Sequence, residues 1–99
     1  MIYKEDLPDS ENVRVTFELP SSVWAERVNL VGDFNDWDTV KDEMRQSRNN
    51  GNWRISLVLP KGRAYQFRYL VNGQDWQNDW HADKYALNKF GTDNSVVQT

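Results

Sequence analysis

The chain has 99 residues, no cysteine and a formal net charge of −3, and it contains five tryptophans. This length is typical of one domain with a modest core. The missing cysteine excludes disulfides and thiolate metal sites, and the acidic balance argues against non-specific nucleic-acid binding. No apolar run approaches the roughly 20 residues of a membrane span, and the first residues lack a signal-peptide core. We therefore expect a cytoplasmic protein with neither nucleic acid nor membrane as a partner.

Residues 1–12 are polar and contain a proline, so we expect a flexible lead-in before one domain over residues 13–99. Apolar and polar residues then alternate in short runs separated by turn residues, which indicates half-buried strands. Residues 41–48 suit either a short helix or an edge strand, with Met44 facing inward. Residues 77–91 are polar and irregular. The expected strands cover 13–19, 27–32, 53–59, 65–71, a strand starting near 76, and 94–98.

A hairpin signal lies in the middle of this pattern. The apolar residues at alternate positions from Tyr65 to Val71 share one face of a strand, so Gln66 and Arg68 lie on the opposite face. Asn72-Gly73 tolerates the positive φ angles that a type I′ turn requires. Trp76 lies just beyond this turn. If the outer face of the sheet is open to solvent, Arg68 and Trp76 could share one surface, which we interpret as a sugar site.

Six or seven short strands without a long helix predict an all-β protein, an antiparallel sandwich. Trp53 is in phase with the apolar residues of its strand, so we expect it in the core. Trp24 and Trp80 receive no assignment from the pattern. His81 has no partner at metal-binding spacing, so we expect a loop residue and no metal site.

The chain also contains four sequence blocks in a characteristic order: VNLVGDFNDW at 28–37, LVLPKG at 57–62, FRYLVNG at 67–73 followed by Trp76, and FGTDNSVV at 90–97. In combination they resemble carbohydrate-binding module family 48. This glycogen-binding domain also occurs at the N-terminus of isoamylase-type debranching and branching enzymes and in the β subunit of AMP-activated protein kinase. The resemblance implies an immunoglobulin-like β-sandwich of the early-set type, with about seven strands.

The resemblance also nominates the carbohydrate-binding residues. Trp37 and Trp76 match the two indoles on which the family stacks sugars. Arg68 matches a basic residue that is Lys in many members, and Asn94 matches an asparagine near the last strand. Phe90 stands where the family often has a leucine that packs against the glucan.

Two departures from the family pattern concern the second indole. Asp75 is an extra residue before Trp76, and Trp80 stands where many members have proline. Either could tilt Trp76 or add a third aromatic platform. Each nominated residue also has a structural alternative. Each of the two indoles, Trp37 and Trp76, could pack under its own loop, and Arg68 could be a solvated charge on its strand. Asn94 could tie the last turn, and Phe90 could serve only in packing.

The chemistry of these residue types suits an α-1,4-glucan. An indole offers a flat, electron-rich face to the C–H groups of a glucose ring. Two indoles held at an angle suit a curved glucan better than a flat cellulose chain. Arg68 and Asn94, with Gln74 or Asn72 as further candidates, would bond the hydroxyl rim. We expect weak binding, on the order of micromolar to millimolar.

Enzyme chemistry has little support in the sequence. Asp33, Asp36 and Asp38 lie in one short loop, whereas a glycosidase needs two carboxylates that flank the bond. A calcium loop that began at Asp33 would place Trp37 at its fifth, ligating position. We therefore expect no catalytic residue, no cofactor and no metal.

The prediction is a non-catalytic module that binds glycogen, starch, maltooligosaccharides or cyclodextrin. The alternative is a protein-interaction domain of the same fold that docks a glycogen-metabolising enzyme or a kinase. The sequence leaves open whether the module stands alone or is excised from a longer protein.

Overall fold

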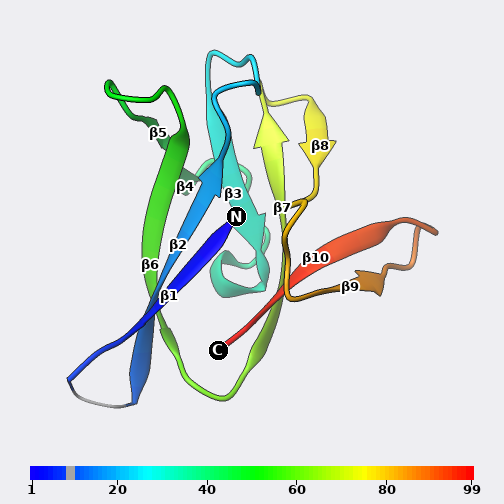
Figure 1. The fold of residues 1–99 in the computed structure, drawn as a ribbon. Helices are drawn as coiled ribbons and strands as arrows, with labels where there is room; N and C mark the ends of the chain where they lie inside the picture. Colours follow the sequence, from blue (N-terminus) through cyan, green and yellow to red (C-terminus); the bar gives the residue numbers. More distant parts are fainter. Residues whose placement is uncertain (9–10) are drawn as a thin grey trace.

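The computed structural model describes residues 1–8 and 11–99. Over these residues the chain forms ten strands and a 3₁₀ helix, η1, in two antiparallel sheets (Figure 1). The first sheet has the order β1-β2-β6-β5, with bounds Ile2–Asp6, Asn12–Leu19, Trp53–Pro60 and Arg45–Gln46. The second has the order β4-β3-β7-β10-β9, with bounds Asp42–Glu43, Val28–Gly32, Ala64–Val71, Asp93–Gln98 and Lys84–Leu87. β8 (Asp75–Gln77) also pairs with β7, and η1 covers Asp33–Asn35.

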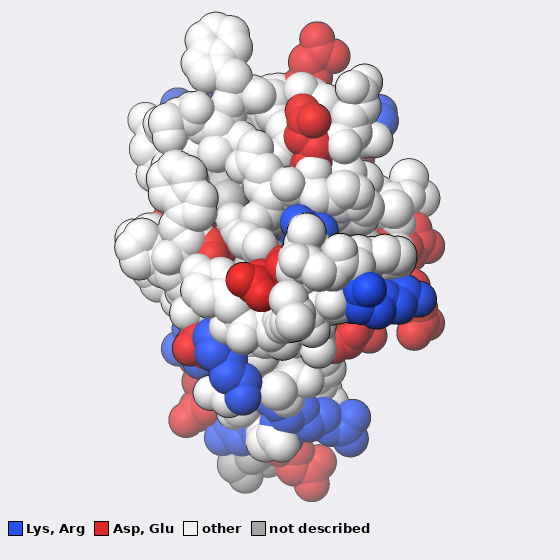
Figure 2. Space-filling view, turned by 90° about the vertical axis from the view of Figure 1, so that its right-hand side faces the viewer, with Lys and Arg blue, Asp and Glu red and all other residues white. Residues whose placement is uncertain are grey.

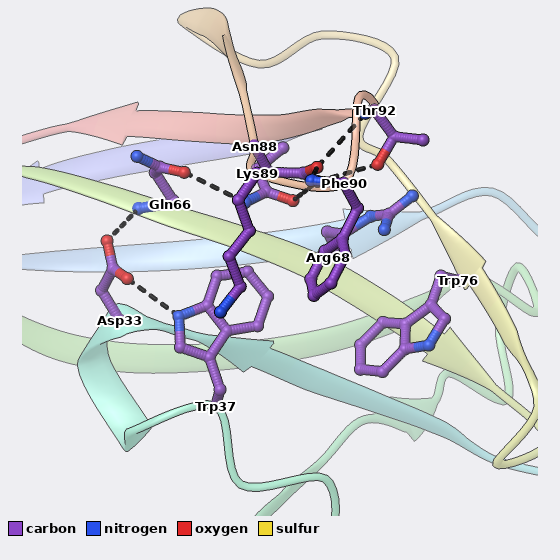
Figure 3. Close-up of a pocket in the computed structure, with 10 residues that line it drawn as sticks. Asp33, Trp37, Gln66, Arg68, Trp76, Asn88, Lys89, Phe90 and Thr92 are labelled. Atoms are coloured by element: carbon purple, nitrogen blue, oxygen red, sulfur yellow. Dashed lines mark hydrogen bonds between the residues drawn. The ribbon is translucent and has the colours of Figure 1, made fainter.

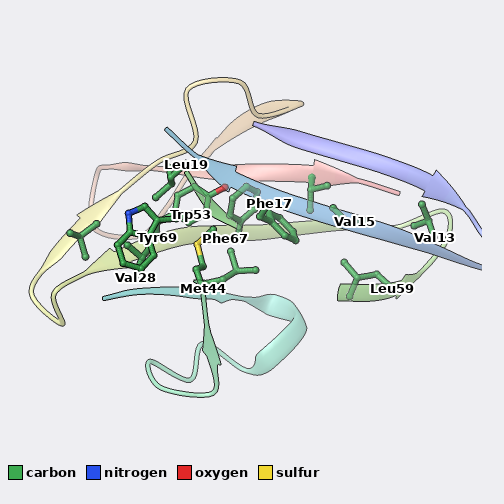
Figure 4. Close-up of a cluster of buried hydrophobic side chains, with 13 residues drawn as sticks. Val13, Val15, Phe17, Leu19, Val28, Met44, Trp53, Leu59, Phe67 and Tyr69 are labelled. Carbon is green, nitrogen blue, oxygen red and sulfur yellow. The ribbon is translucent and has the colours of Figure 1, made fainter. Parts of the chain in front are cut away.

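The predicted immunoglobulin-like sandwich is confirmed, and its core lies between the sheets (Figure 4). The rings of Phe17 and Phe67 meet edge to face at 5.0 Å between centroids, and Phe67 meets Tyr69 at 5.6 Å. Such pairs contribute about 0.5–1.5 kcal/mol beyond the area they bury. Trp53 and Met44 are both buried, as the sequence predicted.

Two expectations about the elements need correction. The segment 1–12 is not a loose lead-in, because β1 pairs with β2 along its whole length, from Ile2 opposite Phe17 to Asp6 opposite Val13. Residues 9–10, which the same expectation covered, lie outside the described residues. β1 is an exposed edge strand, so its sequence carries no apolar alternation. Residues 77–91 are likewise not wholly irregular, because they contain β9. For the segment 41–48, where a helix or an edge strand was expected, the edge-strand alternative is confirmed, because β4 and β5 each lie at the edge of a sheet.

β7 is the strand that organises the second sheet. One of its edges pairs with β3, while the other pairs with β10 over its first half and with β8 over its second half. Phe67, Tyr69 and Val71 face the core, and Gln66 and Arg68 face outward, as the alternation predicted. Neighbouring strands therefore frame the outward side chains of β7.

The β7–β8 hairpin has the predicted turn with one residue more than the shortest connection. Asn72 and Gly73 have φ angles of 54° and 67°, and the amide of Gln74 donates to the carbonyl of Val71 at 3.1 Å. Both φ signs fit a type I′ turn. The strand ladder begins with Asp75 opposite Val71, so the extra residue is absorbed as a bulge between the turn and β8.

Among the described residues, no helix is both long enough and apolar enough to cross a membrane.

Candidate functional site

A groove of about 670 Å³ lies on the outer face of the second sheet (Figure 3). All five nominated residues line it, although they come from four separate segments of the chain. The lining residues are Asp33, Trp37, Gln66, Arg68, Trp76, Asn88, Lys89, Phe90, Thr92 and Asn94. The structure thus brings together the residues that the resemblance nominated.

Trp37 reaches the groove through an unusual backbone. It follows η1 with a φ of 57°, directly after Asp36 with a φ of 55°. Positive φ is rare for a bulky side chain and clusters at functional sites. The indole Nε1 donates to Oδ1 of Asp33 at 2.9 Å, while Oδ2 of the same carboxylate accepts the backbone amide of Gln66 at 2.7 Å. Asp33 therefore ties the first indole to β7.

A buried asparagine holds the loop that presents Trp37. The side-chain oxygen of Asn35 accepts the amide of Gly32 at 3.0 Å, and its nitrogen donates to the carbonyl of Leu30 at 2.9 Å and to Oδ2 of Asp42 at 2.8 Å. Gly32 is needed because a Cβ there would lie 2.6 Å from the carbonyl oxygen of Gln66. β3 and β7 thus approach too closely for any other residue at this position.

The second indole lies beside the predicted cation. Trp76 is 42% exposed and lies opposite Leu70, on the outward face that also carries Arg68. The guanidinium carbon of Arg68 lies 5.9 Å from the centre of the indole ring, which is within the range of a cation–π contact. The Nε of Arg68 is buried without a hydrogen-bond partner among the described residues. Arg68 therefore lies over the ring of Trp76 and lines the groove beside it.

The third wall is the β9–β10 turn, which Asn88 holds together. Its Oδ1 accepts the amides of Phe90 at 2.9 Å and Thr92 at 3.2 Å, and its Nδ2 donates to Oγ1 of Thr92 at 2.8 Å. This turn presents Phe90, which is 80% exposed. A large apolar ring held so far in solvent by an ordered turn is available to a ligand.

Asn94 has two structural partners as well as a place in the groove. It is buried, donates from Nδ2 to Oε1 of Gln66 at 3.0 Å, and accepts from Nδ2 of Asn88 at 3.2 Å. Its amide therefore joins the turn to β7. The predicted binding role of Asn94 and its structural alternative are compatible in this arrangement.

Sequence reasoning missed half of the lining. Strand alternation places Gln66 on the outward face with Arg68, which was the signal that could have nominated it as a site residue. Asn88, Lys89 and Thr92 carry no local pattern of their own. The further candidates Asn72 and Gln74 do not line the groove, and Oδ1 of Asn72 instead accepts the amide of Glu26 at 2.7 Å.

The groove has little charge, and its chemistry is that of amides, a hydroxyl and aromatic rings. Asp33, Arg68 and Lys89 are its three ionisable residues, and the amine of Lys89 lies 5.3 Å from the centre of the Phe90 ring. Within the described part of the chain, no three His, Asp or Glu residues gather to hold a metal. Figure 2, which views the side of the molecule with β8 and the β9–β10 hairpin, shows Lys and Arg gathered toward the lower part and uncharged side chains over the upper left. Such a surface suits a neutral ligand with both flat apolar faces and hydroxyl groups.

A β-sandwich with an open, aromatic and weakly charged groove has the character of a carbohydrate-binding module. The chain matches the family model of Carbohydrate-binding module 48 (Isoamylase N-terminal domain) over residues 5–86 and belongs to this family. Trp37, Arg68 and Trp76 lie within the matched residues, whereas Phe90 and Asn94 lie beyond them.

The chain is also similar to bacterial enzymes named 1,4-alpha-glucan branching enzyme GlgB. It is 40% identical to that of Mesorhizobium japonicum over 53 residues, which is 50% of this chain and 7% of the relative. It is 37% identical to that of Thiobacillus denitrificans over 73 residues, 70% of this chain and 10% of the relative. It is 47% identical to that of Shewanella sp. (strain MR-4) over 57 residues, 52% of this chain and 8% of the relative. The matched segment thus spans a tenth or less of the length of these relatives.

Proposed function

We propose that this carbohydrate-binding module is non-catalytic and binds α-1,4-glucans such as glycogen, starch and maltooligosaccharides in the groove between Trp37, Trp76 and Phe90. The observation that carries this proposal is the convergence of two indoles and a phenylalanine from three segments on one weakly charged groove. The names of the similar branching enzymes support an α-1,4-glucan as the ligand class.

Stacking on the indoles supplies the main attraction in this proposal. Stacking of a flat ring on an aromatic side chain contributes about 1–3 kcal/mol in the nucleic-acid analogue. Trp37 and Trp76 lie on either side of Arg68 as Figure 3 draws them, so one glucan could contact both rings. Two such contacts sum to about 2–6 kcal/mol before the free energy lost on association, which places the binding at the weak end of the expected micromolar to millimolar range.

Polar groups on β7 and the β9–β10 turn would orient the sugar. Arg68 makes no ion pair within the described residues, so its terminal nitrogens can donate to hydroxyl groups. The amine of Lys89 offers a second kind of donor from the turn. A sugar hydroxyl that bonds to one of these donors gives up a hydrogen bond to water, so the net gain in binding free energy is small. We therefore expect these polar side chains to orient the sugar rather than to supply the affinity.

A protein partner in the same groove is the alternative, in which the module docks a glycogen-metabolising enzyme or a kinase. We favour the sugar because amides and aromatic rings with few charges suit a polyhydroxylated neutral ligand. Partner docking is better placed on surfaces outside the groove, where it would not compete with the glucan.

The test is isothermal titration calorimetry with maltoheptaose and with β-cyclodextrin. The variants are Trp37→Ala, Trp76→Ala and their double mutant, and the matched control is Trp24→Ala. Trp24 is 93% exposed and does not line the groove, so its loss removes an indole without touching the site. Far-UV circular dichroism and urea unfolding check that each variant folds.

By calorimetry we expect saturable binding in the wild type and in Trp24→Ala, at least a fivefold loss in each single variant, and, in the folded double mutant, affinity too weak for calorimetry to detect. A wild type that binds neither ligand at several millimolar would refute the glucan site. Unchanged affinity in the double mutant would move the site away from this groove.

A further inference from the structure

A second hollow lies at the border of β8, apart from the groove. It has a volume of about 270 Å³ and brings residues from the end of β2 next to the segment that follows β8. Its lining residues are Met1, Leu19, Pro20, Ser22, Val23, Gln77, Asn78, Trp80 and His81. None of them lines the groove, and the side chains of the hollow combine apolar groups with neutral amides.

Trp80 lines this hollow, and its large ring is exposed to solvent. It is 75% exposed, more than Trp76 at 42%. An exposed indole contributes nothing to the core, since the cluster of buried residues between the sheets does not include it. Core packing therefore does not account for a tryptophan at this position, although hydrogen bonds hold the backbone on both sides of it in place.

Asp79 holds that backbone, and every polar atom of this residue has a partner. Its side chain is fully buried, with Oδ2 accepting from the hydroxyl of Tyr69 at 2.7 Å and from the amine of Met1 at 2.7 Å. Its Oδ1 accepts the amide of His81 at 2.7 Å, and its own amide donates to Oγ of Ser95 at 2.9 Å. Its carbonyl accepts the hydroxyl of Tyr85.

The consequence is that Trp80 is presented from a fixed base. The residues on both sides of it, Asp79 and His81, are tied to each other and to the core. A side chain that starts from an ordered backbone loses less conformational entropy on binding than one on a mobile loop. Trp80 is in this respect comparable to Trp37, which also stands on a hydrogen-bonded turn.

β8 forms the shared border of the hollow and the groove. Adjacent residues of a strand point to opposite faces, and here Trp76 lies opposite Leu70 while Gln77 lies opposite Tyr69. Trp76 accordingly lines the groove and Gln77 lines the hollow. A polymer that leaves the groove across this three-residue strand would meet the hollow next.

We propose that the hollow beside Trp80 is a second subsite for α-glucan, which a chain bound in the groove reaches by crossing β8. This inference rests on the proposed function. The lining favours a sugar over a charged peptide, because its side chains are apolar groups, amides, a hydroxyl and one histidine. Occupying both sites with one chain turns the second contact into an intramolecular event and raises the apparent affinity for long chains only.

The experiment compares a short with a long ligand, maltotriose with glycogen. Calorimetry measures the first and affinity electrophoresis in glycogen-containing gels the second. We expect Trp80→Ala to bind maltotriose within twofold of the wild type and glycogen at least threefold more weakly. Trp80→Tyr, which keeps an aromatic platform, should recover part of the loss, and Trp24→Ala, which leaves the hollow unchanged, should match the wild type.

Ligand contact at each indole can be measured directly from the five tryptophan Nε1–H resonances in a ¹H–¹⁵N spectrum, which single substitutions assign. In the Trp37→Ala, Trp76→Ala double variant, maltoheptaose at high millimolar concentration should still shift the Trp80 signal and leave the Trp24 signal in place. A Trp80 signal that never moves, or an equal loss of glycogen affinity in Trp24→Ala, would overturn the second subsite while the groove stands. A wild type without any glucan binding would remove both proposals.

Discussion

The substitution Asp33→Asn tests how the groove holds its first indole. The carboxylate of Asp33 accepts two donors, Nε1 of Trp37 at 2.9 Å and the backbone amide of Gln66 at 2.7 Å. Asparagine has the same shape, but one of its two acceptor atoms becomes an NH₂ donor. The remaining oxygen is expected to face Gln66, where the contact is shorter, so the indole N–H loses its acceptor.

The magnitude follows from this single lost bond. A released indole must be immobilised again when the ligand binds, and ordering one side chain costs about 0.5–1.5 kcal/mol. At about 1.4 kcal/mol for each factor of ten, the affinity for maltoheptaose should fall about 2- to 12-fold. The free energy of unfolding should fall by about 0.5–1.5 kcal/mol, since Asp33 is exposed and water can replace the bond.

Asp36→Asn is the matched control for the change in charge. Asp36 lies in the same loop, and asparagine tolerates its φ of 55°. Among the described residues, its carboxylate has no hydrogen-bond or ion-pair partner that the substitution would remove. Calorimetry should give wild-type affinity for this control and weakened affinity for Asp33→Asn, with urea unfolding measured on both. Equal affinities in the two variants would show that the Asp33 carboxylate does not position the indole.

Three further predictions concern the strands and turns around the site. Gly32→Ala should lower the urea midpoint and weaken maltoheptaose binding, because its Cβ would lie 2.6 Å from the carbonyl oxygen of Gln66, and overpacking costs about 1–3 kcal/mol. Asn88→Ala should speed amide hydrogen exchange at Phe90 several-fold and weaken glucan binding, because it removes the acceptor of that amide; unchanged exchange would contradict the role of Asn88 in holding the turn. Burial and the neighbouring carboxylate of Asp79 raise the pKa of Tyr69 well above 10.0. The stabilising effect of the neutral phenol is therefore complete below pH 10 and declines above it, as the unfolded chain releases a proton that the folded chain keeps. Urea midpoints at several alkaline pH values should fall less in Tyr69→Phe than in the wild type.

The sequence predicted those parts of the fold in which one face of a strand is buried. β2, β6 and β7 each alternate between core and solvent, and each lies close to its expected bounds. The sequence did not predict β1 and β9, because neither strand has a buried face. Both are exposed edge strands that pair with their neighbours through backbone hydrogen bonds. An edge strand needs a partner rather than an apolar pattern, so local sequence alone does not reveal it.

The same distinction applies to the groove. Arg68 and its neighbour Gln66 follow from strand parity, and Trp37 and Trp76 were named through the family resemblance. Asp33 was noticed only as one carboxylate of three, because its role depends on two donors, one of them 33 residues away in the chain. Asn88 was missed because it acts through a turn whose shape appears only when β9 and β10 pair.

The bulge in the β7–β8 hairpin explains why an extra residue does not remove Trp76 from the groove. A connection of two residues would pair Val71 with Gln74 and would set Trp76 opposite Tyr69, on the core face. The observed register pairs Val71 with Asp75 and Trp76 with Leu70, on the face of Arg68. A one-residue change in a strand reverses every side chain beyond it, so the insertion and the bulge compensate each other. The position of the second indole is thus determined by the register of β8, and the departure at Asp75 is compatible with a complete groove.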